Sequence, residues 1–145
     1  MAIKVVDTLH SKLPKQIGVL DGSTTVTAGQ LLYRDTTNAV LKVVTSGAGT
    51  TENIEGVATK SVVSGGTTVN YLIVDSVTFC VCDCTSNTAA NQLYKNQAMT
   101  DGATIANSSS TTASTSGIFV PLAIVGAAAD KKLYGYFVKV GQLAN

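Results

Sequence analysis

Short apolar stretches alternate with turn signals along most of the chain, beginning at Ile17. The stretches are rich in Val, Ile, Leu and Tyr and are bounded by Gly, Asn, Asp, Ser and Thr, a pattern typical of short β-strands. The dipeptide Asp21-Gly22 is a hairpin signal. The pattern predicts strands at residues 17–20, 26–33, 39–44, 54–63, 69–74, 77–81, 92–94, 118–125 and 133–140. Their number and spacing predict an all-β fold, a compact β-barrel or a β-tulip or sandwich of short strands.

Two connecting segments complete this prediction. Residues 126–130 are the only helical candidate and are too short for more than one turn. Residues 107–117 are almost entirely Ser, Thr, Ala and Gly, so they offer little to bury and predict an exposed, mobile loop.

Residues 1–16 differ from the rest of the chain. They contain His10, Pro14 and four charged residues and show weak periodicity. We interpret them as an N-terminal extended arm, ordered against a partner, that precedes a single β domain at 17–145. The alternative is that residues 3–6 form an ordinary strand of the body.

A weak internal repeat divides the predicted domain. The sequence GQLLYR at residues 29–34 resembles NQLYK at residues 91–95, and a hairpin-like segment follows each. Two related β units, at 17–75 and 79–140, would explain the repeat. Strand-rich sequences also share such patterns by chance, so both explanations stay open.

Composition and charge narrow the function classes. Thr and Ser number 20 and 12, whereas Lys and Arg together number 10 and Asp and Glu together 9. The scattered basic residues form no stripe for nucleic acid, and weak net charge favours self-association. The longest apolar run, at 118–129, is too short to span a membrane. The first seven residues lack the apolar core of a secretory signal, which indicates synthesis in a cytoplasm.

The three cysteines alternate as Cys80, Cys82 and Cys84. Alternate residues of a strand project from one face at about 6.5–7 Å, too far apart for a disulfide. The spacing is also poor for tetrahedral zinc. We therefore expect three free thiols that act as small buried hydrophobic residues, and no metal or other cofactor.

Catalytic arrangements are scarce, and we expect no enzyme activity. His10 is the only histidine, so a nucleophile–histidine pair would have to recruit it from the arm. Glu52 and Glu55 are close in sequence but adjoin a glycine-containing loop, and we interpret them as solvated surface charges. No phosphate-binding or calcium-binding motif occurs.

Three short motifs resemble those of a known family. They are AGQLLY at residues 28–33, IEGVA at residues 54–58, and the strand at 68–74 that follows the Gly65-Gly66 turn. Together they resemble the capsid decoration (cement) proteins of tailed bacteriophages, closely over residues 17–75 and loosely over residues 91–140.

The resemblance implies a function and a location. It implies a β-barrel-like or β-tulip body, usually a homotrimer, that binds the major capsid protein on the outer surface of the virion head and stabilises the shell. It also implies that the arm at 1–16 lies on the capsid lattice. The candidate capsid contacts in that arm are Ile3, Lys4, Val5, Leu9, His10, Lys12 and Lys15.

The alternative function is a recognition module of a head fibre or tail fibre that binds a host-surface glycan. Such a module exposes aromatic platforms for sugar stacking. The five tyrosines fall mostly within predicted strands, where packing in a core or an interface is the expected role; they are Tyr33, Tyr71, Tyr94, Tyr134 and Tyr136.

Overall fold

The structure is a computed structural model, and it describes residues 2–8, 15–45, 53–74, 78–107 and 117–138. These residues form eleven strands and two three-residue 3-10 helices. The predicted all-β fold of short strands in a barrel or sandwich is therefore confirmed. None of the described helices has the length and apolar character needed to cross a membrane.

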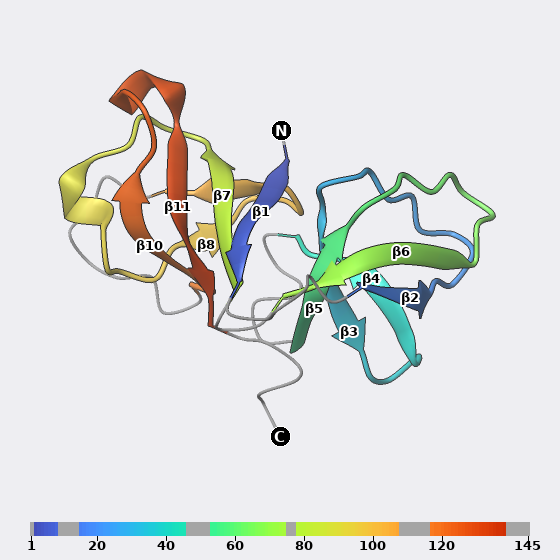
Figure 1. Cartoon of the computed structure of the whole chain (residues 1–145). Helices are drawn as coiled ribbons and strands as arrows, with labels where there is room; N and C mark the ends of the chain where they lie inside the picture. The colour runs from blue at the N-terminus through green and yellow to red at the C-terminus, as the bar shows by residue number, and fades with distance from the viewer. Residues whose placement is uncertain (1, 9–14, 46–52, 75–77, 108–116, 139–145) are drawn as a thin grey trace.

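Six strands form the first sheet, on the left of Figure 1. Its strand order is β10-β11-β7-β9-β8, and β1 also pairs with β7. The Gln97 N–H donates to the Phe119 carbonyl at 2.7 Å, which joins the segment before β8 to β10, so the sheet curls until its two ends meet. The strands are β1 (Ile3–Thr8), β7 (Thr78–Cys84), β8 (Ala98–Met99), β9 (Thr104–Ala106), β10 (Phe119–Ile124) and β11 (Lys132–Phe137).

Five antiparallel strands form the second sheet, on the right of Figure 1. Its order is β2-β6-β5-β3-β4. The sheet curls so that its two terminal strands, β2 and β4, approach each other. The strands are β2 (Lys15–Val19), β3 (Leu31–Asp35), β4 (Val40–Val43), β5 (Asn53–Ala58) and β6 (Thr68–Ile73).

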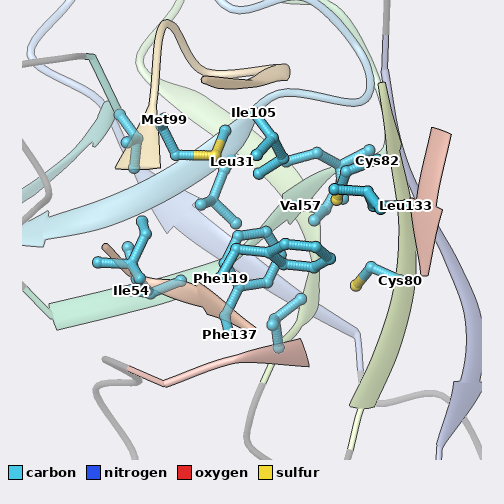
Figure 2. Packing of buried hydrophobic residues seen from close by; sticks show 14 of the residues in the cluster. Leu31, Ile54, Val57, Cys80, Cys82, Met99, Ile105, Phe119, Leu133 and Phe137 are labelled. Carbon is cyan, nitrogen blue, oxygen red and sulfur yellow. The ribbon is translucent and has the colours of Figure 1, made fainter. Parts of the chain in front are cut away.

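The two sheets share one hydrophobic core. Leu31 and Ile54 of the second sheet pack in the same buried cluster as Phe119, Leu133 and Phe137 of the first, and Figure 2 shows these side chains between the strands. A second cluster, which includes Leu32, Val69 and Tyr71, fills the other face of the second sheet. The second sheet is therefore buried on both faces over much of its area. The cluster that it shares with the first sheet couples the two sheets.

The segment expected to be an arm begins as a strand of the body. Strand β1 pairs antiparallel with β7, with Ile3 opposite Cys82 and Val5 opposite Cys80. Ile3 is only 3% exposed, and its N–H donates to the Gly29 carbonyl at 2.9 Å. Figure 1 places β1 at the boundary between the two sheets. The structure thus has the ordinary strand that the sequence left as the alternative, because residues 3 and 5 are apolar and alternate.

Several predicted boundaries differ from the structure. The strand predicted at 92–94 is wrong: the chain forms a 3-10 helix at Ala90–Gln92 instead. Strands β8 and β9 were not predicted, since they are only two and three residues long. The helical turn predicted within 126–130 is present as Ala128–Asp130.

The loop predicted at 107–117 is not exposed where the structure describes it. Asn107 is buried, and its amide donates to the carbonyls of Ser86 and Asn87 at 2.9 and 3.2 Å. Gly117 is buried as well. The intervening residues lie outside the described part of the chain. The amide of Asn107 satisfies backbone groups that composition alone does not reveal.

The two segments that share a sequence motif also share a local geometry. The side-chain oxygen of Gln30 accepts from the Thr27 N–H at 2.8 Å, and that of Gln92 accepts from the Ala89 N–H at 3.0 Å. In both segments the glutamine N–H also donates to the carbonyl three residues earlier. Each glutamine therefore closes the same kind of turn.

The lowered pKa values of two aspartates in turns predict that the protein loses stability in acid. Hydrogen bonds from the Ser23 and Thr24 N–H groups lower the pKa of Asp21 to about 2, and the Lys42 ammonium does the same for Asp35. Because both pKa values lie below the ordinary 3.8, their contribution is present above pH 4 and lost as pH falls toward 2. Urea midpoints measured from pH 5 to 2 should fall, and fall less in the D21N/D35N variant.

Candidate functional site

The residues expected to contact a capsid have different surroundings. Ile3 is buried in the shared core, so it is unavailable as a surface contact, and Val5 packs against the same core. Lys4 is exposed and alternates with them. The remaining candidates lie outside the described residues, namely Leu9, His10, Lys12 and the side chain of Lys15.

Among the described strands, β2 carries the two most exposed apolar side chains. Ile17 is 71% exposed and Val19 is 57% exposed. Between them, Gly18 faces the other side of the sheet, where a Cβ would meet Leu41 and Tyr71. Strand β2 therefore presents two apolar side chains to solvent beside a buried glycine. Exposed apolar groups of this kind mark contact surfaces when they adjoin one another.

The backbone of β2 is also open on one side. The Leu20 N–H donates to the Thr67 carbonyl at 2.8 Å, and the register with β6 is continuous from Lys15 to Val19. Since hydrogen-bonded residues alternate along an antiparallel pair, the N–H and C=O groups of Ile17 and Val19 point away from β6. Among the described strands only β6 pairs with β2, so these groups lie on an edge that no other described strand covers.

A cavity of about 410 Å³ opens between this edge and β4. Val19 from β2 and Val40 and Leu41 from β4 line its apolar side, whereas Arg34 and Glu55 line its polar side. The cavity exists because the curled second sheet brings β2 and β4 close without joining them. A cavity of this size suits a small ligand or an inserted side chain.

A partly buried ion pair forms the polar side of the cavity. The Arg34 Nη2 donates to Glu55 Oε2 at 2.6 Å, and the Tyr71 hydroxyl donates to Glu55 Oε1 at 3.1 Å. Glu55 is only 7% exposed, so the interpretation of this residue as a solvated charge is wrong. Burial and the neighbouring Glu55 charge raise the pKa of Tyr71 to about 12, which keeps the hydroxyl protonated as a donor.

The chemistry of the cavity favours binding of an uncharged group. Arg34 and Glu55 balance each other's charge, and Arg34 and Tyr71 both donate to the Glu55 carboxylate. A charged guest would lose its hydration without gaining an opposite charge that is free. An aliphatic side chain, in contrast, would contact Val40 and Leu41.

The cysteines are confirmed as free and buried. Cys80, Cys82 and Cys84 all point into the shared core and form no disulfide. Burial raises the pKa of Cys80 to about 12 and that of Cys82 well above its usual range. Burial and the Asp83 charge raise the pKa of Cys84 to about 12. The described residues contain no group of three or more Cys, His, Asp and Glu placed to hold a metal.

The thiols are therefore expected to be unreactive toward thiol reagents in the folded protein. Only the thiolate reacts, and at pH 8 almost none forms when the pKa is about 12. Ellman's reagent should titrate no thiols at pH 8 and all three in denaturant. Substitution of all three by Val should leave the fold intact, with destabilisation of a few kcal/mol at most. Rapid reaction of one native thiol would show that its strand opens.

Aromatic side chains gather on the outer face of the first sheet. The rings of Phe79 and Tyr134 stack with centroids 5.8 Å apart, and Tyr136 meets Phe79 edge-on at 6.3 Å. All three are half-buried. Tyr94, in contrast, is 73% exposed, and Tyr33 is buried. Of the two roles expected for the tyrosines, packing in a core is therefore wrong for Tyr94, and packing in an interface stays a prediction.

A scan of the chain against protein-family models finds no matching family, and a search of curated proteins finds no matching sequence. The function is therefore inferred from the residues and their arrangement.

Sequence patterns did not indicate the cavity. Arg34, Glu55 and Tyr71 come from three strands, and each residue alone is an ordinary strand or turn residue. The alternation of the apolar residues Ile17 and Val19 is visible in the sequence. An exposed face of a strand and a buried face have the same period of two residues, however, so the alternation does not show which face is open. Only the position of β2 at the end of its sheet identifies which face is open.

Proposed function

We propose that the chain is a viral capsid decoration (cement) protein that binds the outer surface of a phage head and stabilises the shell. The observation that carries the proposal is the pair of exposed side chains Ile17 and Val19 on β2, a strand at the end of its sheet. A soluble protein gains from covering such a surface, and a shell offers a fixed partner for it. The resemblance of the sequence motifs to decoration proteins supports the same function.

The proposed role is a structural one, carried out through binding partners and not through catalysis. The major capsid protein is the proposed binding partner, and the chain is proposed to act as a homo-oligomer, a trimer, on the virion surface without a cofactor. Low net charge favours such close assembly. Many copies on one shell turn modest individual contacts into tight overall binding.

Shell binding tests the proposal directly. The purified chain is added to heads of the phage that encodes it, stripped of their decoration protein, and co-sedimentation is measured. The variant I17K/V19K should lose binding, because each charge would have to be buried on contact. Both side chains are exposed, so the variant should fold normally.

The matched control is V63K, which changes a side chain that is 78% exposed in a loop. We expect this variant to bind heads like the unmodified protein. Heads that fail to retain the unmodified chain, or that retain I17K/V19K equally well, would contradict the proposal.

Glycan binding is the second candidate, and Tyr94 is the observation that favours it. Its side chain is 73% exposed on backbone with φ of 63°, a conformation that costs about 1–2 kcal/mol for a residue other than glycine. An exposed aromatic ring suits stacking on a sugar. Binding to host-surface polysaccharide that is lost in Y94A, together with no binding to heads, would favour this function.

A further inference from the structure

The two sheets have equivalent strand orders. The order β2-β6-β5-β3-β4 of the second sheet corresponds to β7-β11-β10-β8-β9 in the first, where the Gln97–Phe119 bridge supplies the link before β8. The registers agree as well. The Leu20–Thr67 hydrogen bond recurs as Cys84–Lys131, and both partners lie 64 residues further along the chain.

The equivalent edges differ in what covers them. In the first sheet, Asp83 and Cys84 pair with β9, and the preceding part of β7 pairs with β1. In the second sheet, the corresponding Val19 lies beside Val40 across the cavity without pairing. Residues 15–18 of β2 correspond to the part of β7 that β1 covers, and no described strand covers them.

The edge of β2 at residues 15–18 resembles the part of the β7 edge that β1 covers. Ile17 corresponds to Val81, whose backbone faces Lys4 of β1, and the backbone groups of Ile17 likewise point outward. Gly18 corresponds to Cys82, which lies opposite Ile3. The cavity lies next to Gly18, in the place where the inward side chain of an added strand would sit.

We propose that the edge of β2 at residues 15–18 binds an extended segment of another protein. The segment pairs antiparallel with β2, as β1 pairs with β7, and inserts an aliphatic side chain opposite Gly18 into the cavity. Strand addition of this kind combines backbone hydrogen bonds with a pocket for alternate side chains.

The chemistry of the cavity defines the partner segment. Its inward residues must be aliphatic, because Arg34 and Glu55 already neutralise each other and Val40 and Leu41 form the remaining wall. Its outward residues face solvent and are free to be polar. The sequence of β1, with Ile3 and Val5 inward and Lys4 outward, has this pattern and supplies a probe.

The test uses the full chain, labelled for NMR, and a synthetic peptide with the sequence AIKVVDT of residues 2–8, blocked at both ends. We expect peptide-dependent shifts at Ile17, Gly18 and Leu41 and slower exchange of the Ile17 amide proton. The variant I17P should bind at least about tenfold more weakly, since it removes one outward donor. Its fold should persist, because that N–H does not face β6.

A second comparison does not depend on the folding of any variant. The peptide AKKVVDT, with Lys in place of the inward Ile, should cause no shifts at β2. Equal binding of the two peptides, equal binding to I17P, or shifts confined to Val81 and its neighbours would each overturn the proposal. The titration contains no phage heads, so its failure and a failure of shell binding are separate results.

Discussion

Removal of residues 1–8 is expected to leave a chain that cannot fold. Strand β1 contributes Ile3 to the shared core and covers the edge of β7. Truncation of one buried isoleucine to alanine costs about 2–5 kcal/mol, and the deletion also removes a ladder of backbone hydrogen bonds. Typical domains have a total stability of about 5–15 kcal/mol. Far-UV circular dichroism and urea unfolding of the truncated chain measure the effect.

Two point variants show whether the loss comes from the core. I3A should keep the fold and lower its stability by about 2–5 kcal/mol, whereas K4A should change it by less than about 0.5 kcal/mol because Lys4 is exposed. The arm hypothesis predicts the opposite for the deletion, a folded oligomer that no longer binds heads. A truncated chain with an unchanged unfolding transition would therefore support the arm.

The second large effect is expected for F119A, which should destabilise both sheets by about 3–5 kcal/mol. Phe119 is fully buried, and its ring packs at a tilt of 57° against that of Phe137, with centroids 5.1 Å apart. It belongs to the first sheet, but its cluster includes Leu31 and Ile54 of the second. Hydrogen exchange should therefore accelerate in β5 and β6 as well as in β10 and β11.

The control is F79A, which removes a ring from the outer face of the first sheet. Phe79 is half-buried, and its ring stacks on that of Tyr134 and meets that of Tyr136 edge-on. The loss of stability in F79A should be smaller than that in F119A, and the faster hydrogen exchange should be confined to the first sheet. If F119A accelerated exchange in the first sheet alone, the two sheets would be independent folding units rather than one.

Most of the fold was predictable because its strands obey local rules. The alternation of Cys80, Cys82 and Cys84 with larger residues predicted their burial, and the structure confirms it. The turn signal Asp21-Gly22 follows the end of β2 correctly, because turn chemistry acts over a few residues, but the hairpin that it predicts is wrong, since β2 pairs with β6 and not with the segment that follows the turn. These features need only neighbours in the sequence.

The predictions that failed concern features that depend on residues distant in the sequence. Residues 3–8 have the same local pattern whether they pair with β7 or with another protein, so the sequence could not decide between an arm and a strand. Glu55 was taken for a surface charge because neither Arg34 nor Tyr71 is its sequence neighbour. The order of the strands in the two sheets determines both the pairing of β1 and the burial of Glu55. The apolar pattern of a single strand carries little information on that order.

The pairing of β1 with β7 has a consequence for synthesis on the ribosome. Strand β1 emerges long before residues 78–84, so the nascent chain carries an unpaired apolar strand while β2 to β6 are already complete. Domains generally fold as units, and the core that the two sheets share is complete only after Phe119, Leu133 and Phe137 have emerged. During that interval, β1 of one nascent chain is free to join the open edge of another, so production at low temperature or with a holding chaperone should raise the yield of soluble protein.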